Sequence, residues 1–150
     1  MPRRIKITFT EESIFAIAEL LEDLAPKTCA AVLSCLPQAG EAHHATYSGS
    51  EVVLILDKIV DIGQENATIM VIPGDVAFTT FEGGKIFGFP DTFSEIAVFY
   101  ARDAIPSMPN GPVPMNIFGR IVEGLEEFAE VSFKMRRSGV KPMTIELLDD

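Results

Sequence analysis

The amino-acid sequence predicts a mainly β protein, a barrel or a sandwich, with two helices. Ile5, Ile7 and Phe9 alternate with polar residues, which is the period expected of a strand with one buried face. Two segments, at 26–36 and 124–138, place their apolar residues at helical spacing instead. Short stretches rich in β-forming residues recur at close spacing through the centre of the chain, at 68–72, 76–80, 85–89 and 95–100.

The length and composition fit one domain spanning residues 1–150. The chain has 150 residues, of which 47% are hydrophobic and 23% are charged, and this is enough apolar material to form a core. Lys and Arg number 12 against 22 Asp and Glu, so the formal net charge is -10. Such a surface is repelled by phosphate backbones and by anionic lipid. We therefore expect neither nucleic acid nor a membrane as a partner.

The lengths of the apolar runs and the positions of the two cysteines indicate the cellular compartment. The apolar runs are shorter than a signal peptide or a membrane span requires. Cys29 and Cys35 lie in one predicted helix, six residues apart in the sequence, and point to different faces, so no disulfide between them is expected. These features predict a soluble, cytoplasmic protein in a reducing compartment.

The first third of the chain is predicted to form two strands, a helix and two further strands. After the strand at 5–10, the segment 14–22 fits either a helix or a strand by its pattern, and propensity alone favours the helix. Pro26 suits the first turn of a helix that ends before Pro37 and Gly40, and we expect this helix to cover one end of a barrel. A β-rich stretch, broken once by a turn, follows at 41–57.

The remaining elements follow from turn residues and charge. Residues 105–114 contain four prolines and an Asn-Gly pair, which predicts a long loop without secondary structure that can line a pocket. A strand is expected at 115–122 and a closing strand at 143–148. Between them, residues 124–138 carry acidic side chains early and basic side chains late, as a helix dipole favours.

Three segments of the chain are similar to segments of the cyclophilin superfamily. They are Leu24-Ala25-Pro26-Lys27-Thr28, Phe118-Gly119-Arg120-Ile121-Val122-Glu123-Gly124-Leu125-Glu126, and Gly139 followed by Lys141-Pro142-Met143-Thr144-Ile145. The order of predicted elements agrees over nearly the whole chain. The resemblance implies a cyclophilin-like closed β-barrel with two capping helices, and it favours a strand for the ambiguous segment 14–22.

A narrower resemblance is to a bacterial family of cyclophilin-like proteins known as a domain of unknown function. It rests on Gly40-Glu41-Ala42 with His44, Tyr47-Ser48-Gly49, Glu65-Asn66-Ala67-Thr68 and Pro73-Gly74-Asp75. The chain departs from the prolyl isomerases of the superfamily, because the stretch His43-His44-Ala45-Thr46-Tyr47 lacks their active-site arginine and the chain has no tryptophan. Since that arginine polarises the rotating amide, the resemblance implies the fold and not the isomerase activity.

Candidate binding residues follow partly from this resemblance. His44 is preferred to His43 because the resemblance places it on the strand that carries the isomerase arginine, where a neutral imidazole can donate and accept. Glu65 and Asn66 can present a carboxylate and an amide to a ligand, although a turn explains the same pair. Arg102 can meet an anion or pair with a surface acid. The full set of expected ligand contacts is His44, Tyr47, Glu65, Asn66, Phe87, Phe99, Arg102 and Asn116.

The predicted function is binding of a small metabolite, with an anion as one candidate, or a small-molecule enzyme that needs no cofactor. A metal is not expected, because neighbouring histidines on a strand face opposite sides and the acids show no ligand spacing. Two alternatives stay open: a prolyl isomerase or proline-peptide module, and an interaction subunit without a ligand. Exposed apolar strand edges are compatible with a homo-oligomer.

Overall fold

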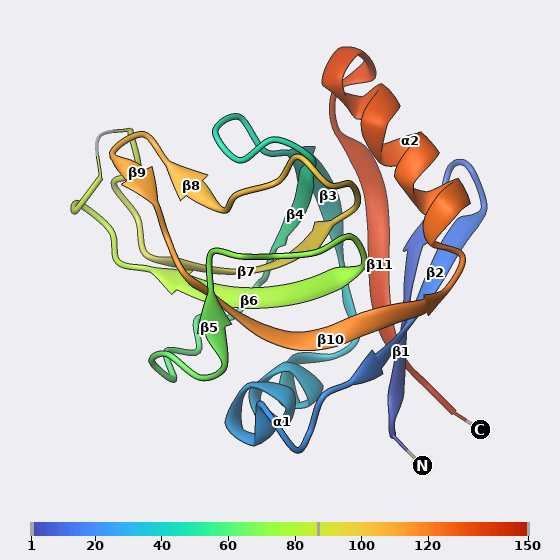
Figure 1. Ribbon diagram of the computed structural model, residues 1–150, viewed down its shortest axis with the longest axis horizontal. Coiled ribbons are helices and arrows are strands. Elements are labelled where there is room, and N and C mark those ends of the chain that lie inside the picture. Colours follow the sequence, from blue (N-terminus) through green and yellow to red (C-terminus); the bar gives the residue numbers. More distant parts are fainter. Residues whose placement is uncertain (1, 87, 150) are drawn as a thin grey trace.

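The computed structural model describes residues 2–86 and 88–149 (Figure 1). Its elements are β1 (Arg4–Phe9), β2 (Ile14–Leu20), α1 (Pro26–Cys35), β3 (Gln38–His44), β4 (Glu51–Ile55), β5 (Ala67–Thr68), β6 (Asp75–Phe81), β7 (Phe93–Phe99), β8 (Ser107–Met108), β9 (Gly111–Pro112), β10 (Met115–Glu123), α2 (Leu125–Ser138) and β11 (Lys141–Leu148).

Eight antiparallel strands close into a barrel. They follow one another in the order β2-β1-β11-β3-β4-β7-β6-β10, and β10 pairs back with β2 to complete the ring. The short strand β5 pairs with the start of β10. The closed β-barrel with two helices is therefore confirmed, and so is the strand favoured for the ambiguous segment that became β2.

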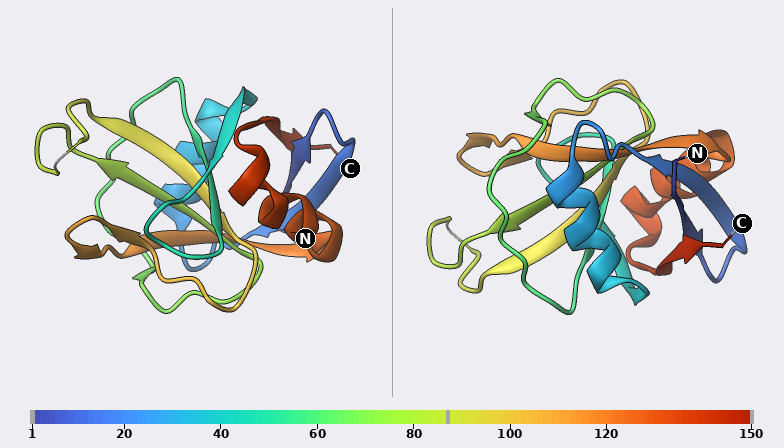
Figure 2. Two further views of the ribbon diagram at one scale, coloured as in Figure 1. Left: turned by 90° about the horizontal axis from the view of Figure 1, so that it is seen from above. Right: turned by 90° about the horizontal axis from the view of Figure 1, so that it is seen from below.

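The barrel interior holds the main hydrophobic core, and both helices contribute to it. Figure 2 shows α2 in front of the strands from one side and α1 in front of them from the other. Apolar side chains of the strands meet those of the helices in one cluster, which includes Cys29 and Val32 from α1 and Phe128 and Met135 from α2. Both cysteines are buried and free, as expected.

A second, smaller hydrophobic cluster lies on the outer face of β6, β7 and β10. Along β4 and β7 the side chains alternate, so that Val52 and Leu54 belong to the interior core while Val53 packs on the outer cluster. The outer cluster is formed by Ala77, Ala97, Phe99, Ala104, Met115 and Ile117. This outward-facing apolar surface, partly covered by the chain around 101–108, positions the candidate site.

Four local expectations are wrong, each for a physical reason. A strand was expected at 68–72, but β5 ends at Thr68, whose hydroxyl accepts the Met70 N–H and turns the chain. At 85–89 the described residues form only an isolated bridge, because Gly84 and Gly88 have positive φ and turn the backbone. The loop expected at 105–114 contains the short β8–β9 hairpin.

The fourth difference concerns β3. This strand begins at Gln38, three residues before the β-rich stretch expected at 41–57, because its backbone pairs with β11 from there on. The Gln38 amide also donates to the Asp57 carboxylate and accepts the Asp57 N–H, which fixes the strand start. Within the described residues, neither helix has the length and apolar character needed to cross a membrane.

Candidate functional site

A pocket lies on the outer face of the barrel, over β4, β7 and the ends of β6 and β10. Its volume is about 250 Å³. One wall is the segment 43–48 and the opposite wall is the segment 106–113, and the two are tied together because the Ser48 hydroxyl accepts the Ser107 N–H at 2.8 Å. Apolar side chains line most of it, among them Val53, Ile55, Phe81, Phe89, Phe93, Met108, Val113 and Met115.

Two glutamates also line this pocket, and both are buried. Glu51 begins β4 and is 3% exposed, while Glu95 lies in β7 and is 8% exposed. The register pairs Glu51 with Phe99 and Glu95 with Ile55, which places both glutamates on the outer face of the sheet. Apolar neighbours on the same strands therefore flank two buried glutamates that line the pocket.

Burial controls the protonation of this carboxyl pair. Loss of hydration raises the pKa of Glu51 to about 7, although a hydrogen bond with Ser48 opposes the rise. Loss of hydration also raises the pKa of Glu95 well above its usual value, and the charge of Glu51 raises it further. Among the described residues Glu95 has no hydrogen-bond or ion-pair partner. The raised pKa values favour the neutral, protonated form of these carboxyl groups.

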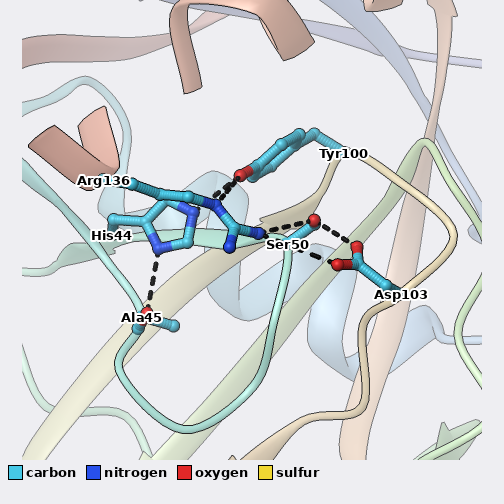
Figure 3. Close-up of polar contacts among 6 residues, drawn as sticks. All are labelled: His44, Ala45, Ser50, Tyr100, Asp103 and Arg136. Atoms are coloured by element: carbon cyan, nitrogen blue, oxygen red, sulfur yellow. Dashed lines mark hydrogen bonds and ion pairs between the residues drawn. The ribbon is translucent and has the colours of Figure 1, made fainter. Parts of the chain in front are cut away.

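A polar network lies beside the pocket, beneath α2 (Figure 3). Arg136 of α2 donates from Nε to the Tyr100 hydroxyl at 3.3 Å and from a terminal nitrogen to the Ser50 hydroxyl at 3.0 Å. Ser50 donates in turn to the Asp103 carboxylate, which forms an ion pair with Arg136. We call the residues His44, Ser50, Tyr100, Asp103 and Arg136 the α2 network.

His44 is the end of this network. Its Nδ1 lies 2.9 Å from the carbonyl oxygen of Ala45, so Nδ1 carries the proton, and its Nε2 accepts the Tyr100 hydroxyl at 2.7 Å. Loss of hydration lowers the pKa of His44, which favours the neutral ring. His44 contributes to the pocket wall, yet both of its ring nitrogens are already engaged within the protein.

The register gives the neighbouring histidine the outward position. His43 pairs with Val53, which faces outward, whereas His44 pairs with Val52, which faces the core. His43 is exposed and also lines the pocket. The two rings thus face opposite sides of the strand, as expected. Sequence reasoning preferred His44 from the family resemblance, but only the strand register could assign the faces.

Three of the expected ligand contacts gather away from the pocket, at the start of α1. The Glu65 carboxylate accepts the N–H groups of Lys27 and Thr28 and the Thr28 hydroxyl. The Asn116 amide accepts the Glu65 N–H and donates to Thr28 and to the carbonyl of Gly63. Asn66 has φ of 50° and donates to the carbonyl of Ile117. This set, which we call the α1 cluster, ties a loop to β10 and caps α1.

The other expected contacts are scattered. Tyr47 lines the pocket and is half exposed. Phe99 is fully buried in the outer cluster, and Arg102 is exposed in the turn after β7, outside the lining of the pocket. Phe87 lies outside the described residues. The pocket thus brings together His44 and Tyr47 from the expected set, and the α1 cluster brings together Glu65, Asn66 and Asn116.

The chain matches the model of the family described as "Protein of unknown function (DUF3830)" over residues 7–147. The chain belongs to this family. No curated protein matches the DUF3830 chain significantly. Because this family has no described function, its membership does not identify a ligand. The ligand is therefore argued from the geometry of the site.

Solved structures share the fold of this DUF3830 chain. A structure of McbB in complex with tryptophan has a TM-score of 0.72 at 15% identity, covering 97% of this chain and 45% of that one. The hypothetical protein AF2241 from Archaeoglobus fulgidus has a TM-score of 0.57 at 23% identity, covering 98% and 95%. The Mimivirus cyclophilin has a TM-score of 0.56 at 12% identity, covering 99% and 90%. The DUF3830 chain thus has a cyclophilin-like fold, and it spans less than half of McbB.

The two pocket glutamates were missed by sequence reasoning. Each is the one charged residue of a mostly apolar strand, in the runs Glu51-Val52-Val53-Leu54-Ile55 and Phe93-Ser94-Glu95-Ile96-Ala97-Val98-Phe99. A lone acid in such a run could have indicated a functional site, because burying a carboxyl group without a partner costs free energy. Their meeting in one pocket depends on the pairing of β4 with β7. Among the described residues, no group of three or more metal-binding side chains gathers anywhere.

Proposed function

We propose that this protein binds a small molecule in the outer-face pocket. The observation that carries the proposal is an apolar cavity of about 250 Å³ into which two buried carboxyl groups open. Small-molecule sites are usually concave and apolar with a few convergent polar groups. Because pockets for drug-sized ligands start at roughly 300 Å³, the ligand is expected to be small, about the size of one ring with a short side chain.

A metabolic anion, one of the candidates from sequence, has the least support. The residues that line the pocket in the described part of the chain include neither arginine nor lysine. Arg102, the expected anion partner, is exposed outside it. An anion would meet Glu51 and Glu95 without a compensating charge, and like charges repel strongly where hydration is reduced.

A cofactor-free enzyme is the second candidate, favoured by the protonation of the carboxyl pair. Glu51 has a pKa of about 7, which suits a general base at neutral pH, and the raised pKa of Glu95 favours the protonated form that a general acid needs. The pair has the properties needed to move a proton on a bound molecule. Binding comes first in either case, so both candidates share the same pocket.

A cytoplasmic location is part of the proposal. The two buried, free cysteines agree with a reducing compartment, in which disulfides are rare. The net charge of -10 continues to argue against nucleic acid and anionic membranes as partners. A second copy of the chain stays a proposal for a protein partner.

The test is a thermal-shift panel of small amines, alcohols, amides, heterocycles and carboxylates, read on wild type and on two tryptophan variants. Ile55 lines the pocket and is half exposed, so Ile55→Trp fills the cavity from its rim. Ile59 is similarly exposed outside the pocket, so Ile59→Trp is the matched control. A ligand of the native state raises the Tm by mass action.

We expect at least one compound to raise the Tm of wild type and of Ile59→Trp while leaving that of Ile55→Trp unchanged. A shift that survives in Ile55→Trp places the binding site elsewhere and contradicts the proposal. Silence of the whole panel with wild type contradicts it as well and favours an interaction subunit.

A further inference from the structure

We propose that the ligand of the outer-face pocket is an apolar amine, bound as its ammonium ion, with Glu95 as the direct partner of the nitrogen and Glu51 as the second acidic group. This inference rests on the proposed function and names the chemical class of its ligand. The ammonium supplies the positive charge that the pocket lacks, and the apolar group of the amine fills the rest of the cavity.

The first argument is the state of Glu95. Its side chain is 8% exposed and lines the pocket, and it has no hydrogen-bond or ion-pair partner in the part of the chain that the structure describes. Buried carboxyls are almost always hydrogen-bonded, because an unpaired one forfeits its hydration without compensation. A hydrogen-bond donor on the ligand would supply the partner that the Glu95 carboxyl group lacks among the described residues.

The second argument is the charge around the pocket. The titratable side chains that line it are His43, His44, Tyr47, Glu51 and Glu95, and neither lysine nor arginine is among its described residues. The nitrogens of His44 are both engaged within the protein, as shown above. The negative charge of Glu51 acts on Glu95 from the neighbouring strand. A bound cation relieves this repulsion, whereas a bound anion increases it.

The third argument separates an organic cation from a metal ion. Ca²⁺ takes six to eight oxygen ligands and Mg²⁺ needs a near-octahedral set, but among the described residues only two carboxyl groups line this pocket. The rest of the lining is apolar and aromatic, including Phe81 and Phe93, whose ring centroids lie 5.3 Å apart. Aromatic walls favour a hydrocarbon body and also attract a neighbouring ammonium.

Binding is expected to release a proton. Near pH 7 the ammonium enters with its charge, and a carboxyl proton of the pair passes to the buffer as the ionised carboxylate forms the ion pair. Apart from this proton transfer to the buffer, no covalent bond forms or breaks. Because the neutral carboxyl must ionise, affinity for the amine is expected to rise as pH passes the raised pKa of Glu51, about 7, where a simple amine stays protonated. A neutral ligand should show no such dependence.

The experiment compares three probes of similar shape by isothermal titration calorimetry: 2-phenylethylamine, 2-phenylethanol and phenylacetate. We expect the amine to bind at least about tenfold more tightly than the alcohol, as a charged hydrogen bond implies, and the carboxylate to bind weakest. Titration in two buffers of different ionisation enthalpy should detect proton release for the amine alone.

Three variants locate the effect. Glu95→Gln and Glu51→Gln keep the shape of the side chain and remove its charge, and each should lower affinity for the amine towards that for the alcohol. Glu41→Gln, on an exposed position of β3 outside the pocket, should leave all three affinities unchanged. Circular dichroism confirms that each variant is folded.

The outcomes separate this inference from the proposed function. If the alcohol or phenylacetate binds as tightly as the amine, or if Glu95→Gln binds the amine like wild type, the pocket binds small molecules but the amine inference is wrong. If none of the three probes binds and no compound of the thermal-shift panel does, both proposals are wrong. If only a divalent cation binds and Glu95→Gln abolishes it, the pair is a metal site and the amine inference is overturned.

Discussion

Two groups of acidic side chains in this barrel relate burial to hydrogen bonding in opposite ways. In the α1 cluster, Glu65 loses hydration, which by itself raises its pKa, but hydrogen bonds from Thr28 and Lys27 lower the pKa overall. In the pocket, Glu95 is more deeply buried and has no partner among the described residues, so its pKa is raised. The hydrogen bonds of Glu65 thus stabilise its carboxylate and the local fold. Burial of Glu95 favours the protonated carboxyl, which is available to a ligand of the kind that we propose.

The contrast explains why the sequence pointed to Glu65 and not to the two pocket glutamates. The Glu65-Asn66 pair before a strand is typical of a ligand contact. In the structure Glu65 accepts the Thr28 N–H and Asn66 donates to the Ile117 carbonyl, so both side chains already bond to the backbone. A fully bonded carboxylate is already committed to the structure. The unbonded one is free for binding, and this property depends on surroundings that are distant in the chain.

The largest effect is expected for Glu51→Gln, measured as stability against pH. The pKa of Glu51 is raised from 4.5 to about 7 in the folded protein, so the unfolded chain loses its proton first as pH rises. Glu51 therefore lowers the stability of wild type between these pH values, and the variant lacks this loss while it keeps the contribution of Glu95. The two should be equally stable near pH 4.5, and the variant should gain about 3 kcal/mol by pH 8.

Urea denaturation across this pH range measures the difference. Glu41→Gln, an exposed glutamate on the neighbouring strand, serves as the control and should follow wild type at every pH. A difference between Glu51→Gln and wild type that stays flat with pH would show that Glu51 is ionised and solvated in the folded state.

The next effect belongs to the α1 cluster. Asn116 is buried and its side chain makes three hydrogen bonds, so Asn116→Ala should lower the free energy of unfolding by about 2–3 kcal/mol at neutral pH. Asn110→Ala, in the exposed β8–β9 turn, is the matched control. Chemical denaturation checks both. Equal stability of the two variants would mean that water replaces the lost amide without cost.

A smaller effect is expected in the α2 network. Tyr100→Phe removes the hydroxyl between Arg136 and His44 and should cost about 1 kcal/mol, because two partly buried hydrogen bonds are lost. Nitrogen NMR of the imidazole should report the change, since Nε2 of His44 loses its donor while Nδ1 keeps the Ala45 carbonyl. Unchanged His44 resonances would contradict the hydrogen-bond chain.

The smallest effect is expected for Arg102→Ala. Arg102 is exposed, lies outside the pocket and has no hydrogen bond or ion pair among the described residues. Its loss should change stability by less than about 0.5 kcal/mol and leave ligand affinity unchanged. A clear loss of affinity for a negatively charged probe would restore the role that sequence reasoning gave to this residue.

The sequence predicted the barrel better than the site, and particular residues show why. Alternation in β1 and the helical stripe after Pro26 are local signals, and together with the motif around Gly119 they led to the fold. The β8–β9 hairpin was missed because its turn lies among prolines that suggested an irregular loop. The placement of Glu51 and Glu95 in one pocket depends on the non-local pairing of β4 with β7, and no pattern in one strand encodes it.

Because side chains alternate along β4 and β7, interior and outward positions of these strands can be substituted independently. Leu54 and Ile96 face the interior and are constrained by the packing that both helices share, while Val53 and Glu95 on the same strands face the pocket. A substitution at an outward position can alter what is bound without disturbing the core one residue away. Homologues with the same barrel and different outward residues on these two strands should therefore have diverged in ligand while keeping one architecture.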